Sequence, residues 1–136
     1  GTSGQTETLS GDSGPLTVWG TPSVDTASGW DSTNSQYAIP TTGYWQMHAH
    51  VAFRGQNQSI RGCMAFLRKV VSGGTDINLA ASWAIVSDET GSPEYQSVDV
   101  NLIHQLAAGD KIYVWCYSPA TIYSSDNRFS CQFLRS

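Results

Sequence analysis

The feature that most constrains this chain is a strict two-residue alternation over residues 44–53. One side of the alternation is apolar and consists of Trp45, Met47, Ala49, Val51 and Phe53. The other side is mostly polar but bulky and consists of Tyr44, Gln46, His48, His50 and Ala52. A period of two over ten residues predicts an extended strand with one buried face. The second face is typical of a surface that meets something other than bulk water.

Further stretches with a two-residue period follow, and turn-forming residues separate them. Residues 72–75 and 107–110 contain the glycines and short polar residues of tight turns. No segment carries a convincing 3.6-residue period. About seven to nine strands at roughly ten-residue spacing predict an all-β fold, an antiparallel sandwich of two sheets. Loops are expected at residues 88–93 and 118–127.

Two of the later strands have informative faces. In residues 77–85 the first face consists of Ile77, Leu79, Ala81, Trp83 and Ile85, and the second of Asn78, Ala80, Ser82 and Ala84. This pattern predicts a half-buried strand. In residues 112–117 three large rings, those of Tyr113, Trp115 and Tyr117, share one face. Three such rings are too many to leave in water, so we expect that face to be covered.

Length and composition limit the classes of function. The 136 residues are enough for one domain with a real core. Residues 1–14, rich in Gly, Ser and Thr, are expected to be a flexible leader or connector, and residues 15–136 a single domain. The net charge of −4, with scattered Lys and Arg, argues against nucleic-acid binding. No apolar run approaches the roughly 18 residues of a membrane helix, so membrane insertion is not expected.

Three cysteines, Cys63, Cys116 and Cys131, are an odd number for a disulfide scaffold. Cys116 and Cys131 fall in predicted strands and are interpreted as small buried hydrophobic residues rather than a bridge. This usage is typical of a protein made in a reducing cytoplasm, even one that later works outside it.

Three ordered motifs bring a family to mind. Residues 39–44, Ile-Pro-Thr-Thr-Gly-Tyr, lead into the alternating strand. Residues 106–114, Leu-Ala-Ala-Gly-Asp-Lys-Ile-Tyr-Val, contain the turn at 107–110, and residues 128–134, Arg-Phe-Ser-Cys-Gln-Phe-Leu, are near the end. Their order and spacing resemble those of the tumour necrosis factor and complement component 1q head superfamily. The family's closing strand usually has glycine where this chain has Cys131.

The resemblance implies a ten-stranded jelly-roll head that assembles as a homotrimer. It also implies that the polar face of residues 44–53 points toward the threefold axis. The predicted trimer interface consists of Tyr44, Gln46, His48, His50, Tyr113, Trp115, Tyr117 and Phe129. Polar residues at Gln46 and His48 suggest hydrogen-bonded or water-filled layers there.

Metal and nucleophile chemistry were weighed for the same residues. The His48-x-His50 pair could chelate a metal, as in cupins, but the cupin pattern needs a nearby glutamate and Arg54 stands near that place. Three copies of His48 around an axis could also bind an ion. The favoured interpretation is an interfacial histidine, with no metal and no cofactor. No Gly-x-Ser-x-Gly motif is present, and the chain is not expected to be an enzyme.

Loop residues supply the remaining candidates. Trp30, Tyr95 and Tyr123 could form ring platforms for sugars, and they are the predicted ligand-binding residues. Asp88, Glu89 and Glu94 are interpreted as a solvated loop rather than a calcium site.

Together these features predict a non-enzymatic trimeric binding head at the end of a fibre or stalk. The favoured setting is a phage or viral receptor-binding domain that recognises a cell-surface glycan or protein, located on the virion surface or extracellularly. The alternatives are a secreted complement-1q-like or cytokine-like ligand head, a structural trimerisation cap and a cupin-like metalloenzyme.

Overall fold

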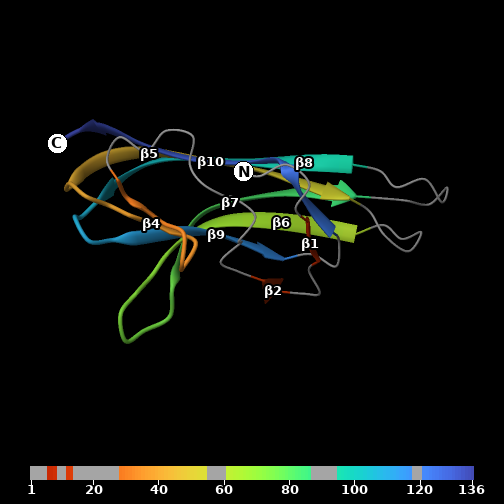
Figure 1. The fold of residues 1–136 in the computed structure, drawn as a ribbon, viewed down its shortest axis with the longest axis horizontal. Coiled ribbons are helices and arrows are strands. Elements are labelled where there is room, and N and C mark those ends of the chain that lie inside the picture. The colour runs from red at the N-terminus through yellow and green to blue at the C-terminus, as the bar shows by residue number, and fades with distance from the viewer. Residues whose placement is uncertain (1–5, 9–11, 14–27, 55–60, 87–94, 118–120) are drawn as a thin grey trace.

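The computed structural model describes residues 6–8, 12–13, 28–54, 61–86, 95–117 and 121–136, and its ten strands form two antiparallel sheets (Figure 1). The all-β sandwich that the sequence predicts is confirmed, and the described residues contain no helix. Accordingly, the described part of the chain has no helix long and apolar enough to cross a membrane.

Sheet A contains four strands in the spatial order β1-β10-β5-β8. Their bounds are Thr6–Thr8 for β1, Thr121–Arg135 for β10, Gly43–Arg54 for β5 and Tyr95–Leu106 for β8. Strand β5, the alternating stretch found in the sequence, is central because it pairs with β10 on one side and β8 on the other. In Figure 1, β5, β10 and β8 form the upper layer.

Sheet B lies below it in Figure 1 and has the order β3-β4-β9-β6-β7, with β2 also paired to β9. Its strands are β2 (Asp12–Ser13), β3 (Trp30–Asp31), β4 (Gln36–Ala38), β6 (Arg61–Lys69), β7 (Ile77–Val86) and β9 (Lys111–Tyr117). Strand β7 lies at one edge of sheet B, and it packs against β8, which lies at one edge of sheet A.

The core lies between the two sheets. Each apolar residue of the alternation, from Trp45 to Phe53, is buried, as the sequence predicts. Strands β6 and β9 close the core from the other sheet with Cys63, Ala65, Leu67, Ile112, Val114 and Cys116. The indole N–H of Trp45 donates to the backbone oxygen of Thr41 at 2.9 Å, so this buried ring keeps a hydrogen bond. Truncating such a side chain to alanine typically costs about 3–5 kcal/mol.

The predicted turn at residues 107–110 is confirmed and joins β8 to β9. The Asp110 carboxylate accepts the Ala107 N–H at 2.9 Å, and the Asp110 N–H donates to the Ala107 carbonyl at 3.0 Å. The Ala108 N–H donates to the Thr42 hydroxyl at 2.9 Å, which ties this turn to the start of β5. Satisfied backbone groups hold the turn in one conformation.

Two expectations about segments differ from the structure. Residues 6–8 and 12–13, expected to belong to a connector, pair with β10 and β9 respectively. The loop expected at residues 118–127 is in part a strand, because β10 begins at Thr121. The remainder of that loop and the loop at residues 88–93 lie outside the described residues.

Of its two faces, strand β7 buries the less apolar one. Ala80 and Ala84 pack against the core, whereas Trp83 is 65% exposed. The cause is register: Ala84 lies opposite the core residue Cys63, and Trp83 lies opposite Met64 on the outer side. A register shift next to Leu67 also lets Leu79 reach the core.

Candidate functional site

The outer face of sheet A carries the polar side of the β5 alternation. Because Trp45, Met47 and Ala49 point into the core, their neighbours Gln46, His48 and His50 point away from it. Gln46 is exposed, and both histidines are part-exposed. The predicted grouping of Tyr44, Gln46, His48 and His50 on one face is therefore confirmed.

Strand pairing places further polar residues beside these histidines. His48 lies between Ser130 of β10 and Asn101 of β8. His50 lies in the same way between Arg128 and Asp99. One row along, Gln46 lies between Gln132 and the apolar Ile103. The centre of this face is thus polar, with an apolar residue at the edge formed by β8.

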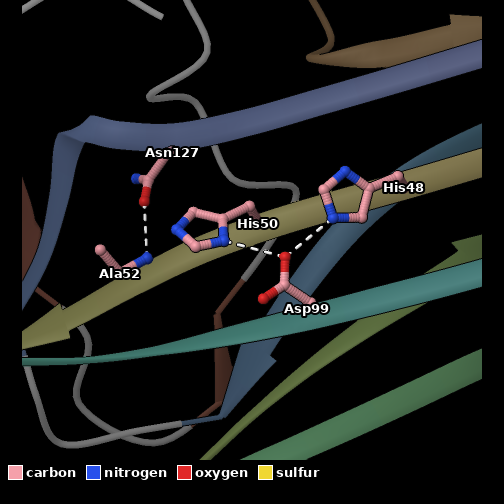
Figure 2. Close-up of polar contacts among 5 residues, drawn as sticks. All are labelled: His48, His50, Ala52, Asp99 and Asn127. Carbon is pink, nitrogen blue, oxygen red and sulfur yellow. Dashed lines mark hydrogen bonds and ion pairs between the residues drawn. The ribbon is translucent and has the colours of Figure 1, made fainter.

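A shared carboxylate joins the two histidines. His48 Nε2 lies 2.8 Å from Asp99 Oδ1, and His50 Nδ1 lies 2.9 Å from the same oxygen. Figure 2 shows the two rings on β5 reaching the carboxylate of the neighbouring strand from either side. A carboxylate oxygen can only accept, so each of these two nitrogens carries a proton. The hydrogen bonds from His50 and, second, from His48 lower the pKa of Asp99.

The sequence analysis did not identify Asp99 as part of the site. It lies 49 residues from His50 and 51 from His48, so only the pairing of β5 with β8 brings it there. A weak signal was available, because Val98 and Val100 flank Asp99 and are both buried. That alternation places Asp99 on an outer face but does not say beside which strand.

The carboxylate of Asp99 supplies beside the two histidines the kind of ligand that the cupin pattern requires. Within the described residues, however, no group of three or more His, Cys, Asp or Glu is placed to hold a metal ion. The paired histidines are instead hydrogen-bonded to the neighbouring strand.

The predicted interface residues of β9 lie on the opposite outer face of the molecule. Ile112, Val114 and Cys116 fill the core, so Tyr113, Trp115 and Tyr117 face away from sheet A. The sandwich therefore separates these rings from His48, and one continuous surface over the centres of both sheets is ruled out. The alternation of one strand does not say which sheet it joins, and the place of these three rings in a trimer interface stays a prediction.

Contacts within sheet B already cover two of these rings. Tyr113 is 5% exposed, and its hydroxyl donates to Asp76 Oδ2 at 2.7 Å. The Trp115 ring lies 5.4 Å from that of Phe66, and the Arg68 guanidinium lies 4.5 Å above it. Contacts within the chain therefore shield Tyr113 and Trp115 from water without a neighbouring copy.

Phe129 also lies elsewhere than expected. It pairs with Ala49, a core residue, and its ring lies 6.1 Å from that of Trp30 between the two sheets. It is therefore on the core side of sheet A and not on the face of His48. Residues directly opposite each other in a sheet share a face, so the pairing with Ala49 places Phe129 on the core side.

The three predicted ligand-binding aromatics lie on three different strands. Trp30 is in sheet B and packs on Phe129. Tyr95, 57% exposed, begins β8 opposite Arg54. Tyr123 is in β10 opposite Ala52 rather than in a loop. Asp88, Glu89 and Glu94, interpreted as a solvated loop, lie outside the described residues.

One edge of the sandwich concentrates exposed apolar side chains. Among the residues whose exposure the structure describes, the exposed large hydrophobic ones are Ile77, Trp83, Ile85, Tyr95, Ile103, Tyr117, Phe133 and Leu134. Five of these eight lie on the adjacent edge strands β7 and β8. Scattered apolar residues are normal on a surface, but such a concentration indicates a contact region.

The comparison with protein families agrees with this architecture. The model of the TNF (Tumour Necrosis Factor) family matches residues 19–131, which is most of the chain. No curated protein matches the sequence. Members of the family form homotrimers, bind receptors, are generally non-enzymatic ligands and are typically extracellular or secreted. The match and the two-sheet fold together show that this chain belongs to the TNF (Tumour Necrosis Factor) family.

Proposed function

We propose that the chain forms a homotrimer and acts as a non-enzymatic head that binds a receptor on a cell surface. The observation that carries the proposal is the unequal distribution of exposed side chains. A polar face on sheet A adjoins an edge, formed by β7 and β8, that holds most of the exposed apolar residues. Membership of a family of trimeric receptor ligands supports the same assembly.

The threefold symmetry requires two different surfaces on each protomer. A ring of three copies is built from heterologous contacts, in which one surface of each copy meets another surface of the next. The sandwich offers such a pair: the face with Gln46 and His48, and the edge with Trp83 and Ile85. In this arrangement the apolar edge of one copy covers part of the polar face of its neighbour. The edge strand β7 would also be shielded from unwanted pairing.

The setting we favour is the receptor-binding tip of a phage or viral fibre, exposed on the virion surface. The sequence has three cysteines, an odd number, and Cys63 and Cys116 are buried in the core. Such cysteine usage suits a chain that folds in a reducing cytoplasm before it is released. A secreted cytokine-like ligand head is the second candidate, and the same family membership supports it.

The proposed ligand is a cell-surface glycan or protein. Tyr95 is the best placed of the predicted ligand-binding aromatics because its ring is exposed at the start of β8. An exposed aromatic ring with a polar tip is a common anchor in binding surfaces. Trp30 is a weaker candidate because its ring packs on Phe129.

Light scattering on the purified chain at neutral pH tests the assembly, and binding of the labelled chain to cells and to an array of defined oligosaccharides tests recognition. We expect a mass near three times 14.7 kDa. We also expect Tyr95→Ala to reduce binding at least about tenfold without changing the mass, whereas Tyr117→Ala on the outer face of β9 has no effect. A trimer that binds neither cells nor oligosaccharides would instead be a structural cap of a fibre.

A further inference from the structure

We propose that the cluster of His48, Asp99 and His50 makes the assembly acid-sensitive, so that proton uptake by the two imidazoles separates the copies while each protomer stays folded. This inference rests on the homotrimer proposed above. The geometry that carries it is the sharing of one carboxylate oxygen by two rings on a part-exposed face.

The charge of this cluster changes sign with proton uptake. With both imidazoles neutral, Asp99 contributes the one charge of the cluster, and Arg128, the strand partner of His50, carries the opposite charge. Histidine is the side chain that ordinarily takes up a proton between about pH 5 and 8. Protonation of both rings would take this group of four residues from zero net charge to +2.

No described acidic side chain other than Asp99 offsets that charge on this face. Strand β5 adds Arg54 and Tyr44 on the same side, and β10 adds Arg135, whose guanidinium lies 5.0 Å from the Tyr44 ring. The other outward positions of β8 are Tyr95, Ser97, Asn101, Ile103 and Gln105. In β1, the titratable residue is Glu7, at the register position of Ile122.

Protonation of His48 and His50 has opposite effects on the single protomer and on the assembly. Inside a protomer each new positive charge lies within 3 Å of Asp99 Oδ1, so protonation strengthens these hydrogen bonds. In the proposed trimer the apolar edge of the neighbouring copy covers part of this face, so the new positive charges lose contact with water, which disfavours the protonated rings. The assembled form therefore binds these protons less readily than the separate protomer does, and linkage shifts the equilibrium toward protomers as the pH falls.

The third histidine of the chain provides a matched control. His104 is also in β8 but pairs with Trp45, a core residue, and thus does not share the outer face with His48. A general effect of histidine titration would involve His104, whereas the proposed device would not. The variants to compare are the double variant His48→Gln/His50→Gln and the single variant His104→Gln. Glutamine keeps an N–H donor for Asp99 but takes up no proton.

The experiment is sedimentation equilibrium of the full chain at about pH 7.5 and about pH 5, with circular dichroism to follow folding. We expect the dissociation constant of the wild type and of His104→Gln to rise at least about tenfold at the lower pH, with an unchanged folded spectrum. The double variant should show less than a twofold rise. If the double substitution prevents assembly at the higher pH, each single glutamine variant should show a smaller rise than the wild type.

The outcomes separate this inference from the proposal on which it rests. A wild-type chain that is monomeric at about pH 7.5 contradicts the homotrimer itself. A wild-type trimer that is equally stable at both pH values overturns only the acid-sensitive device. A pH dependence of the dissociation constant that persists in the double variant also overturns the device. A pH dependence that His104→Gln abolishes does the same.

Discussion

The side-chain oxygen of Asn127 accepts the backbone N–H of Ala52 at 2.9 Å, and 75 residues of sequence separate the two (Figure 2). At this point the register between β10 and β5 shifts, so that the four residues 124–127 lie opposite the single residue Val51. The bulge removes backbone acceptors from β5, and the amide of Asn127 replaces one of them. Asn127 is 1% exposed, so the bond is shielded from water.

Replacing Asn127 should therefore destabilise the fold. We expect Asn127→Ala to lower the free energy of unfolding by about 1–3 kcal/mol, because the buried N–H of Ala52 loses its acceptor. Asn101→Ala, at an exposed position of β8, is the control and should change stability by less than about 0.5 kcal/mol. Urea denaturation measures both. Equal effects of the two substitutions would show that the hydrogen bond in the bulge contributes little.

A second prediction concerns Tyr113 and Asp76, which connect β9 to the segment before β7. Burial, followed by the hydrogen bond to Asp76, raises the pKa of Tyr113 to about 12. A raised pKa means that the folded state favours the neutral phenol, so this stabilisation is complete below pH 10 and is lost as the pH rises toward 12. We expect Tyr113→Phe to cost about 1–3 kcal/mol at neutral pH, since it leaves the Asp76 oxygen without this donor.

Ultraviolet titration of the tyrosines tests the same pair directly. In the wild type the phenol of Tyr113 should ionise near pH 12, and Tyr113→Phe should lose that part of the absorbance change. Tyr117→Phe, at an exposed position four residues further along the same strand, should keep it. Loss of the late-titrating phenol from Tyr117→Phe instead would refute the assignment.

The third prediction follows from Asp99. Its pKa is lowered by the hydrogen bonds from His50 and His48, so the folded state favours the ionised carboxylate. The resulting stabilisation is present above the ordinary pKa of 3.8 and is lost as the pH falls through the lower pKa of the folded state. The difference in melting temperature between the wild type and Asp99→Asn should therefore shrink as the pH falls below about 4. A difference that stays constant down to about pH 2 would contradict this linkage.

The fourth prediction concerns the apolar edge. Ile103 is 60% exposed beside Gln46, so a charge there costs little in a single protomer. In the proposed assembly it would be desolvated between copies, and Ile103→Glu should raise the dissociation constant at least about tenfold. The matched substitution Tyr117→Glu, on the outer face of β9, should leave the constant unchanged. Analytical ultracentrifugation distinguishes the two, and equal effects would exclude the β8 edge from the contact.

The sequence was sufficient to predict which residues of a single strand share a face. The alternation of residues 44–53 predicted both the buried face and the polar face of β5, because a half-buried strand has a period of two. It was insufficient where the answer depended on a partner strand. For β7 it showed which residues share a face, but the opposition of Ala84 to Cys63 decided which face is buried.

The proximity of Asp99 to His48 and His50 depends in the same way on register between strands about fifty residues apart. The alternation of Tyr113, Trp115 and Tyr117 likewise does not identify the sheet to which their strand belongs. The start of β10 was missed because Ser124, Ser125, Asp126 and Asn127 have the composition of a loop, and they form the bulge instead.

The most direct test of the account is the mass of the unmodified chain in solution at neutral pH, measured by sedimentation equilibrium at micromolar concentration. The account predicts a single species of three times 14.7 kDa. A single species of 14.7 kDa would contradict it, because the polar face of sheet A and the apolar edge of β7 and β8 would then have no neighbouring copy to cover them.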